Sequence, residues 1–318
     1  MTTETPILEN EHFRLIQVAD GIYAAIATLR GGAMSNAGIV DLGDETIVFD
    51  AFLTRAAAAA LRAAAVELTG RTPRFLILSH PHGDHVCGST AFLPEAKIAS
   101  SSGTRAAMAA EADEEIDRDE LASLIRQLEE TLDGASDERA RFNCEMNLHP
   151  RRWLLEELPI EPVIPAIALD GELEIRGSDR TIRLVSTGPA HTCDDLLLVC
   201  AKEQTVFLGD LGFFQDSPAY IAPEGSAANW SARLCALEAE DVSCFVPGHG
   251  AIGGREELTR QRGFLDAAVA AARDASRAGG TVDDVIERMR ESEYARWEET
   301  MSFAVSLQSV LIQAEEGR

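Results

Sequence analysis

Three histidines and one aspartate stand within six residues, directly after an apolar run, and this cluster constrains the chain more than any other feature. The run Arg74–Leu78 has the composition of a buried strand. A strand end followed by Pro and Gly lets alternate side chains turn inward, whereas a continuous helix would scatter them. Imidazole and carboxylate are ligands of divalent metals, zinc above all. The cluster therefore predicts a metal site, with a histidine-rich surface loop as the alternative: Ser79-His80-Pro81-His82-Gly83-Asp84-His85.

The composition allows a large folded core and disfavours polyanionic partners. The chain has 318 residues, 46% of them hydrophobic, enough for one large domain or two smaller ones. A formal net charge of −25 argues against general affinity for nucleic acid or anionic membranes. The six cysteines include no CxxC pair, the N-terminus lacks signal-peptide features, and no apolar run reaches membrane-spanning length. We therefore expect a cytoplasmic protein with no nucleic-acid or membrane partner.

Two β-rich blocks, each followed by helices, account for most of the chain. Residues 13–50 predict an antiparallel meander, and an Ala-rich helix follows from about Thr54, a plausible N-cap, to Leu68. The strand before the histidine cluster then completes a crossover unit. A short strand is expected at Ala96–Ala99, and the second block has strands at Val163–Leu169, Glu172–Ile175, Thr181–Ser186, Leu196–Val199, Thr205–Leu208 and Cys244–Val246, with a helix near Asn229–Leu237.

Two helical regions complete the organisation, and we expect a single domain over residues 1–318. A helical insertion is expected at about 104–157, with one apolar stripe that packs against the domain. C-terminal helices are expected at about 255–316, broken at Gly279-Gly280. Four insertion residues are candidates for a substrate mouth: Phe142, Arg151, Arg152 and Trp153.

Three further metal-binding side chains follow apolar strands in the second half. His191, Asp210 and His249 each come after such a strand and a turn with Gly or Pro. A lone histidine after a strand is more often structural, but this arrangement repeats three times downstream of the cluster. Cys87 and Cys193 lie two residues beyond candidate ligands, and we expect them to be small core residues rather than part of the site.

In these positions the chain resembles the metallo-β-lactamase superfamily, over about residues 13–250. The resemblance implies an α/β (α+β) fold, the four-layer αββα sandwich with a metal site along one edge of two sheets. Asp50 matches the first family motif, a carboxylate that orients a metal-bound histidine. The other motifs follow in family order: the HxHxDH motif at His80, His82, Asp84 and His85, and then His191, Asp210 and His249.

The resemblance also implies two metal ions, Zn²⁺ in the first instance with Fe or Mn as alternatives, joined by a bridging carboxylate. Asp84 would in addition orient a metal-bridging hydroxide. The implied ligands are His80, His82 and His191 for the first ion, Asp84, His85 and His249 for the second, and Asp210 between them.

The implied activity is that of a zinc-dependent hydrolase whose bridging hydroxide cleaves an acyl bond in a small molecule, namely a β-lactam, ester, lactone or thioester. Asp210 disfavours a dedicated β-lactamase, and the distance in sequence from Asp210 to Tyr220 disfavours a lactonase. The alternative is a mononuclear non-haem iron enzyme similar to persulfide dioxygenases, which needs two histidines and one aspartate. The helical insertion and the tail offer surfaces on which a homo-oligomer could form.

Overall fold

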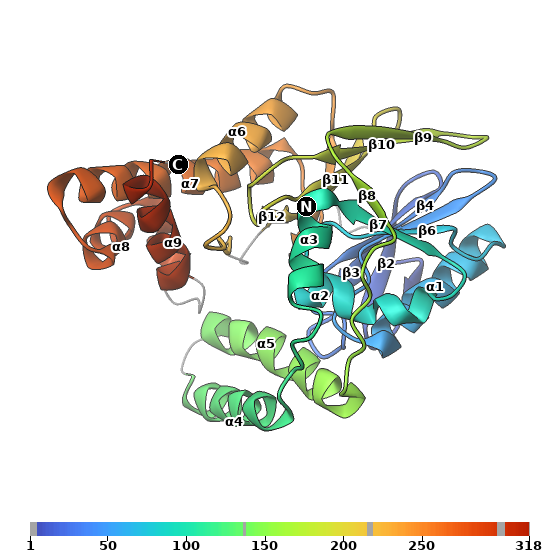
Figure 1. Cartoon of the computed structure of the whole chain (residues 1–318), viewed down its shortest axis with the longest axis horizontal. Coiled ribbons are helices and arrows are strands. Elements are labelled where there is room, and N and C mark those ends of the chain that lie inside the picture. The colour runs from blue at the N-terminus through green and yellow to red at the C-terminus, as the bar shows by residue number, and fades with distance from the viewer. Residues whose placement is uncertain (1–4, 136–137, 215–218, 298–302, 318) are drawn as a thin grey trace.

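Two β-sheets packed face to face between helices form the centre of the computed structural model (Figure 1), which describes residues 5–135, 138–214, 219–297 and 303–317. Within these ranges the first sheet has eight strands, antiparallel from β1 to β5 and parallel from β5 to β8. Its strands are β1 (Leu8–Glu9), β2 (Phe13–Ala19), β3 (Ile22–Ala27), β4 (Ala37–Asp41), β5 (Thr46–Phe49), β6 (Phe75–Ile77), β7 (Lys97–Ser101) and β8 (Ile167–Leu169).

The second sheet has five strands in the order β13-β12-β11-β10-β9 within the same ranges. Its pairs are antiparallel except β12 with β13, which is parallel. Its strands are β9 (Glu172–Arg176), β10 (Thr181–Ser186), β11 (Leu196–Cys200), β12 (Thr205–Phe213) and β13 (Cys244–His249).

Alternate residues of the buried strands face two different apolar layers. In β5, Ile47 and Phe49 pack into the layer between the sheets, while Val48 packs outward under α1 (Arg55–Thr69). In β12, Phe207 faces the other sheet, and Val206 faces α6 (Ala227–Glu238) and α7 (Arg255–Ala278). Because strand side chains alternate with a period of two, one strand supplies both layers. The predicted αββα sandwich is confirmed.

The helices that cover the sheets begin and end close to the predicted residues. The Thr54 hydroxyl accepts from the Ala57 amide at 3.2 Å at the start of α1, and Gly70 ends the helix in the left-handed conformation that glycine adopts most easily. The second sheet is covered by α6 (Ala227–Glu238) and α7 (Arg255–Ala278), followed by α8 (Val282–Arg290) and α9 (Phe303–Glu315). The tail breaks at Gly279-Gly280 as predicted, and residues 298–302 lie outside the described ranges.

The helical insertion lies between β7 and β8 and consists of α3 (Ser102–Ala110), α4 (Arg118–Gly134) and α5 (Glu138–Glu157). The apolar stripe of α4 packs mainly on α5, where Leu121, Ile125 and Leu128 meet Cys144 and Leu148. The stripe was expected to pack against the domain. It packs mainly on the other long helix of the insertion, in a cluster that also includes Leu53 and Met34 from outside the insertion. In Figure 1 α4 and α5 form a pair set apart from the sheets.

Two polar contacts attach the C-terminal end of α5 to the sandwich. Arg55 and Ala56 are the first two residues of α1, and the Glu157 carboxylate accepts hydrogen bonds from their backbone amides at 2.6 and 2.8 Å. The Trp153 indole donates to the Arg30 carbonyl at 3.2 Å. A carboxylate at a helix N-terminus satisfies free amides and interacts favourably with the helix dipole. In the described part of the chain, no helix is long and apolar enough to cross a membrane.

Replacing Glu157 with alanine should therefore loosen the insertion. We expect a loss of about 0.5–2 kcal/mol in the free energy of unfolding, as for loss of an N-cap, and faster proteolysis within residues 104–157. Urea denaturation and limited proteolysis measure the two effects. The control is Glu156→Ala, an exposed neighbour on the same helix. Equal stability and equal cleavage rates in the two variants would contradict the anchoring role.

Candidate metal centre

Seven histidine and aspartate side chains from both halves of the chain meet at one edge of the sandwich. They form two groups, and within each group the potential ligand atoms lie within 4.8 Å of one another. The groups contain all seven predicted ligands in the predicted division, with Asp210 counted in the first: His80, His82, His191 and Asp210, and then Asp84, His85 and His249.

The strands position these side chains largely as the sequence pattern predicts. The histidine cluster follows β6, with His85 in the short helix α2 (Gly83–Val86), and His191 lies in the loop after β10. Asp210, by contrast, lies inside β12 rather than in a turn after it. The strand continues to Phe213 because its pairing with β13 passes through register irregularities on either side of Gly209.

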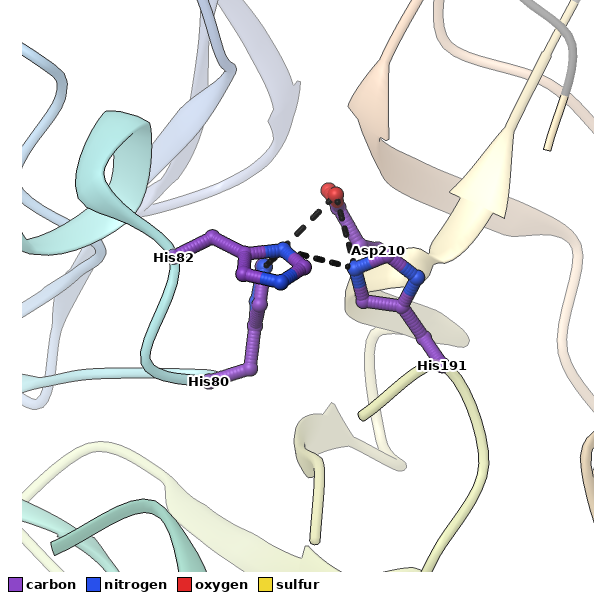
Figure 2. A group of neighbouring side chains, drawn as sticks. All are labelled: His80, His82, His191 and Asp210. Atoms are coloured by element: carbon purple, nitrogen blue, oxygen red, sulfur yellow. Dashed lines mark hydrogen bonds and ion pairs between the residues drawn. The ribbon is translucent and has the colours of Figure 1, made fainter. Parts of the chain in front are cut away.

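In the first group, three ring nitrogens and one carboxylate oxygen face a common centre (Figure 2). His82 Nδ1 lies 3.2 Å from His80 Nε2 and 3.0 Å from His191 Nε2. Asp210 Oδ2 lies 3.6 Å from His80 Nε2 and 3.3 Å from His191 Nε2. A single proton can bridge only one of these pairs, whereas a cation at the centre would contact all four atoms.

Contacts behind the rings fix which nitrogen faces the centre. His191 Nδ1 lies 2.7 Å from the Tyr220 carbonyl, which can only accept, so Nδ1 carries the hydrogen. The Ser79 hydroxyl donates to Asp50 and therefore accepts from His80 Nδ1 at 2.8 Å. In both rings Nε2 is left with its lone pair toward the centre, as a metal ligand requires.

In the second group, the other oxygen of the Asp210 carboxylate is shared. Oδ1 lies 3.0 Å from His85 Nε2 and 3.4 Å from His249 Nε2, and Asp84 Oδ2 lies 3.2 Å from the latter. Asp210 Oδ1 and His85 Nε2 are buried, and although they form this ion pair, neither makes a hydrogen bond within the described residues. Buried polar atoms without partners are costly, and a cation between them would satisfy both. The residues present therefore fit a pair of metal ions.

Asp50 makes the contact that its predicted orienting role requires. It follows β5 directly, with a positive φ of 65°, and its carboxylate accepts from the Ser79 amide at 2.7 Å and hydroxyl at 2.8 Å. Its Oδ2 also lies 2.8 Å from His85 Nδ1. This leaves His85 Nε2 directed at the second group.

Two supporting residues were not predicted from the sequence. The buried Asn36 amide donates to the Pro247 and Gly250 carbonyls, at 2.9 and 2.8 Å, and so ties the strand end around His249 to the first sheet. At Gly248, a Cβ atom would lie 2.0 Å from Asp210 Oδ1. Glycine is required there because the backbone approaches the shared carboxylate too closely for a side chain.

The two groups differ in protonation. Burial lowers the pKa of His191 to about 3 and lowers that of His80 well below its usual value, so both rings are neutral. For His249, burial opposes the charged form, but Asp210 and Asp84 outweigh it and raise the pKa to about 9. His85 follows the same pattern, with Asp210, Asp50 and Asp84 raising its pKa against the effect of burial. The second group therefore holds protons that a metal must displace.

A cavity of about 970 Å³ opens over the two groups, and its lining includes Asp84 and Asp210. Of the four insertion residues proposed for a substrate mouth, Phe142 and Arg151 line it. The other two do not, because Arg152 pairs with Glu129 at the surface and the Trp153 indole bonds to the backbone.

The remaining sequence candidates lie outside both metal-ligand groups. Burial raises the pKa of the Cys87 thiol to about 12 and also raises that of Cys193, as expected for inert packing residues. His12 is buried and accepts from the Gly32 amide at 3.1 Å, which is a structural role.

Comparison with known proteins identifies the family. The sequence profile of the metallo-beta-lactamase superfamily matches residues 30–249, more than half of the chain. The chain belongs to the metallo-beta-lactamase superfamily. Members of this superfamily are generally hydrolytic enzymes. A comparison with curated protein sequences gives no match.

Solved structures show the same fold at low sequence identity. The stereoselective inverting sec-alkylsulfatase from Pseudomonas sp. matches with a TM-score of 0.68 and 14% identity, over 95% of this chain and 50% of its own. The metallo-beta-lactamase from Pontibacter korlensis gives 0.58 and 12%, over 80% and 99%. The DIM-1 metallo-beta-lactamase gives 0.55 and 17%, over 82% and 100%. The chain thus spans about half the length of the alkylsulfatase.

Lowering the pH should remove a metal ion from the second group before the first. At pH 7, below the raised pKa of His249, this ring is protonated in the metal-free protein and must lose its proton to bind a metal. Affinity at the second group should therefore fall from about pH 9 downward, while the neutral rings of His80 and His191 let the first group retain its ion. Zinc content after dialysis at pH 8, 7 and 6 measures this order. Simultaneous loss of both ions would contradict the difference in protonation.

Removing the shared carboxylate should disrupt both groups without unfolding the chain. We expect Asp210→Ala to bind at most one zinc ion per chain and to lose about 100-fold or more of any zinc-dependent turnover. Metal analysis, turnover and circular dichroism give the three readouts, with the exposed Asp241→Ala as control. Two bound ions and full activity in Asp210→Ala would contradict the bridging role.

Proposed function

We propose that the protein is a hydrolase that uses two zinc ions to cleave an acyl bond in a small molecule, namely a β-lactam, ester, lactone or thioester. The observation that carries the proposal is the pair of adjacent ligand groups that share Asp210 beneath a cavity of about 970 Å³. Such a cavity has the volume of a small-molecule site.

The ligand sets suit catalytic rather than structural ions. His80, His82 and His191 would hold the first ion, and three imidazoles leave a coordination position open. The second would be held by Asp84, His85 and His249, with Asp210 between the two. Bound zinc ions would lower the pKa of a coordinated water and polarise the carbonyl oxygen of the acyl group.

The chain's own residues supply orientation and charge. Asp84 lines the cavity, and although burial raises its pKa, His85 and His249 outweigh this effect and keep it ionised. As a carboxylate it can accept a hydrogen bond from an attacking water and so direct the oxygen lone pair at the substrate. Asp50 holds His85 in place from behind. The Cys87 thiol, with its pKa of about 12, is protonated at neutral pH and does not serve as a nucleophile.

Two other functions are distinguishable candidates. A mononuclear iron enzyme similar to persulfide dioxygenases would use two histidines and one aspartate, which would leave the second ligand group without a role. Sulfate-ester hydrolysis is a candidate because the fold is similar to that of the sec-alkylsulfatase. The similarity covers 95% of this chain and therefore includes part of the C-terminal helices. The acyl hydrolase is preferred to the iron enzyme because both ligand groups take part in it.

A panel of substrates tests the proposal directly. The purified protein is stripped with a chelator, restored with zinc, and assayed on a chromogenic cephalosporin, p-nitrophenyl butyrate, a γ-lactone, an acyl thioester and a sec-alkyl sulfate. We expect turnover of at least one acyl substrate, lost about 100-fold or more on stripping and recovered with zinc. Hydrolysis of the sulfate alone would favour the sulfatase. One iron ion per chain with persulfide oxidation would favour the dioxygenase.

A further inference from the structure

We propose that Arg151 of α5 is the receptor for an anionic group of the substrate, so that the substrate is an anionic molecule with an apolar body. The inference rests on the proposed function, because it names a substrate class for the same cavity. It assigns the selection of that substrate to the helical insertion rather than to the sheets that hold the metal ligands.

The rotation of α5 about its axis directs Arg151 into the cavity. Cys144 and Leu148 pack against α4, where the Cys144 thiol also donates to the Leu128 carbonyl at 3.0 Å. With this face fixed, residues three and four apart on the other side of the helix face the metal groups. The residues of α5 that line the cavity are Phe142, Asn143, Met146, Asn147 and Arg151.

The guanidinium is held in place without being neutralised. Its Nη1 donates to the Asn147 carbonyl at 2.9 Å and to the Asn147 side-chain oxygen at 3.0 Å, one turn earlier on the helix. Asn147 in turn donates to the Asn143 carbonyl at 2.9 Å. Among the described residues, no carboxylate pairs with Arg151, and its Nε and Nη2 have no hydrogen-bond partner. Two parallel donors therefore remain for a ligand.

Charge favours an anion at this position. Burial lowers the pKa of Arg151, but a guanidinium stays protonated at any pH that the fold would experience, so the cavity contains a fixed positive charge. Asp84 is the one carboxylate among the described residues whose charge raises the pKa of Arg151 against the effect of burial, and it belongs to the second ligand group. Once that carboxylate binds a metal, the positive charge of Arg151 is left uncompensated within the cavity.

Two other arginines differ from Arg151 in exposure or pairing. Arg14 lines the cavity but is exposed on β2, directly opposite Glu9 of β1. Arg152 pairs with Glu129 at 2.6 Å on the surface. Of these three arginines, Arg151 is therefore the anion receptor. Its guanidinium can donate two parallel hydrogen bonds to a carboxylate or sulfonate.

The rest of the lining suits an apolar body. Met34, Phe142, Met146 and Phe213 contribute to the wall of the same cavity. A substrate that places its oxyanion on Arg151 can extend an apolar portion along these side chains and reach the ligand groups at the cavity floor.

A pair of fluorescent probes that differ in one sulfonate tests the assignment by binding alone. The sulfonate probe is 8-anilinonaphthalene-1-sulfonate, and N-phenyl-1-naphthylamine has the same rings without the charge. We titrate both into zinc-loaded wild type and Arg151→Met. We expect the Kd of the sulfonate probe to rise about 10- to 100-fold in the variant, as for loss of a charged hydrogen bond, with the Kd of the neutral probe within about twofold.

Three further variants separate a charge effect from a structural one. Arg151→Lys should recover part of the affinity for the sulfonate probe, because the charge remains and the fork is lost. Arg152→Met should leave both probes unchanged. The inference is overturned if Arg151→Met binds the sulfonate probe as wild type does, if both probes weaken equally, or if the loss instead accompanies Arg14→Met.

The two proposals fail in different ways. Absence of zinc-dependent hydrolysis, with the selective loss of sulfonate binding still present, overturns the proposed function and leaves the anion receptor. Zinc-dependent hydrolysis with no selective loss in Arg151→Met overturns the anion receptor and leaves the hydrolase.

Discussion

The Asp210 carboxylate, 3% exposed, holds together the two halves of the chain at their common edge. One of its oxygens faces histidines of the first ligand group, and the other faces His85 and His249. So many buried nitrogen and oxygen atoms cannot satisfy one another with protons, and the orphaned atoms His85 Nε2 and Asp210 Oδ1 show where the deficit lies. The irregular pairing of β12 with β13 and the glycine at position 248 both accommodate this carboxylate.

The remaining architecture divides the work between a packed sandwich and a helical insertion. The sheets interleave their apolar layers and so fix the ligand-bearing loops at one edge, with Asp50 and Asn36 as polar supports. The insertion buries much of its apolar surface between its own two long helices, and Glu157 and Trp153 tie it to the sandwich. This arrangement allows the insertion to set the shape and charge of the cavity while the sheets set the positions of the ligands.

The sequence predicted which histidine and aspartate side chains gather at one edge, because each follows a local signal, an apolar run that ends in Pro or Gly. The layers were predictable for the same reason, since strand alternation is local. What depended on tertiary contact was not predictable. The contact between the Tyr220 backbone carbonyl and His191 does not depend on the residue type at position 220, so the sequence does not predict it. The different positions of Arg151 and Arg152 follow from the packing of α5 on α4, which fixes the rotation of α5. The location of Asp210 inside β12 follows from irregular pairing between β12 and β13, which the local sequence pattern does not predict.

The central claim is that one carboxylate bridges two metal ions, and anomalous diffraction from crystals of the zinc-loaded protein tests it most directly. Data collected on either side of the zinc absorption edge should show two peaks about 3.5–4 Å apart, one within each ligand group, with Asp210 between them. A single peak, or a second ion bound away from Asp84, His85 and His249, would contradict the account.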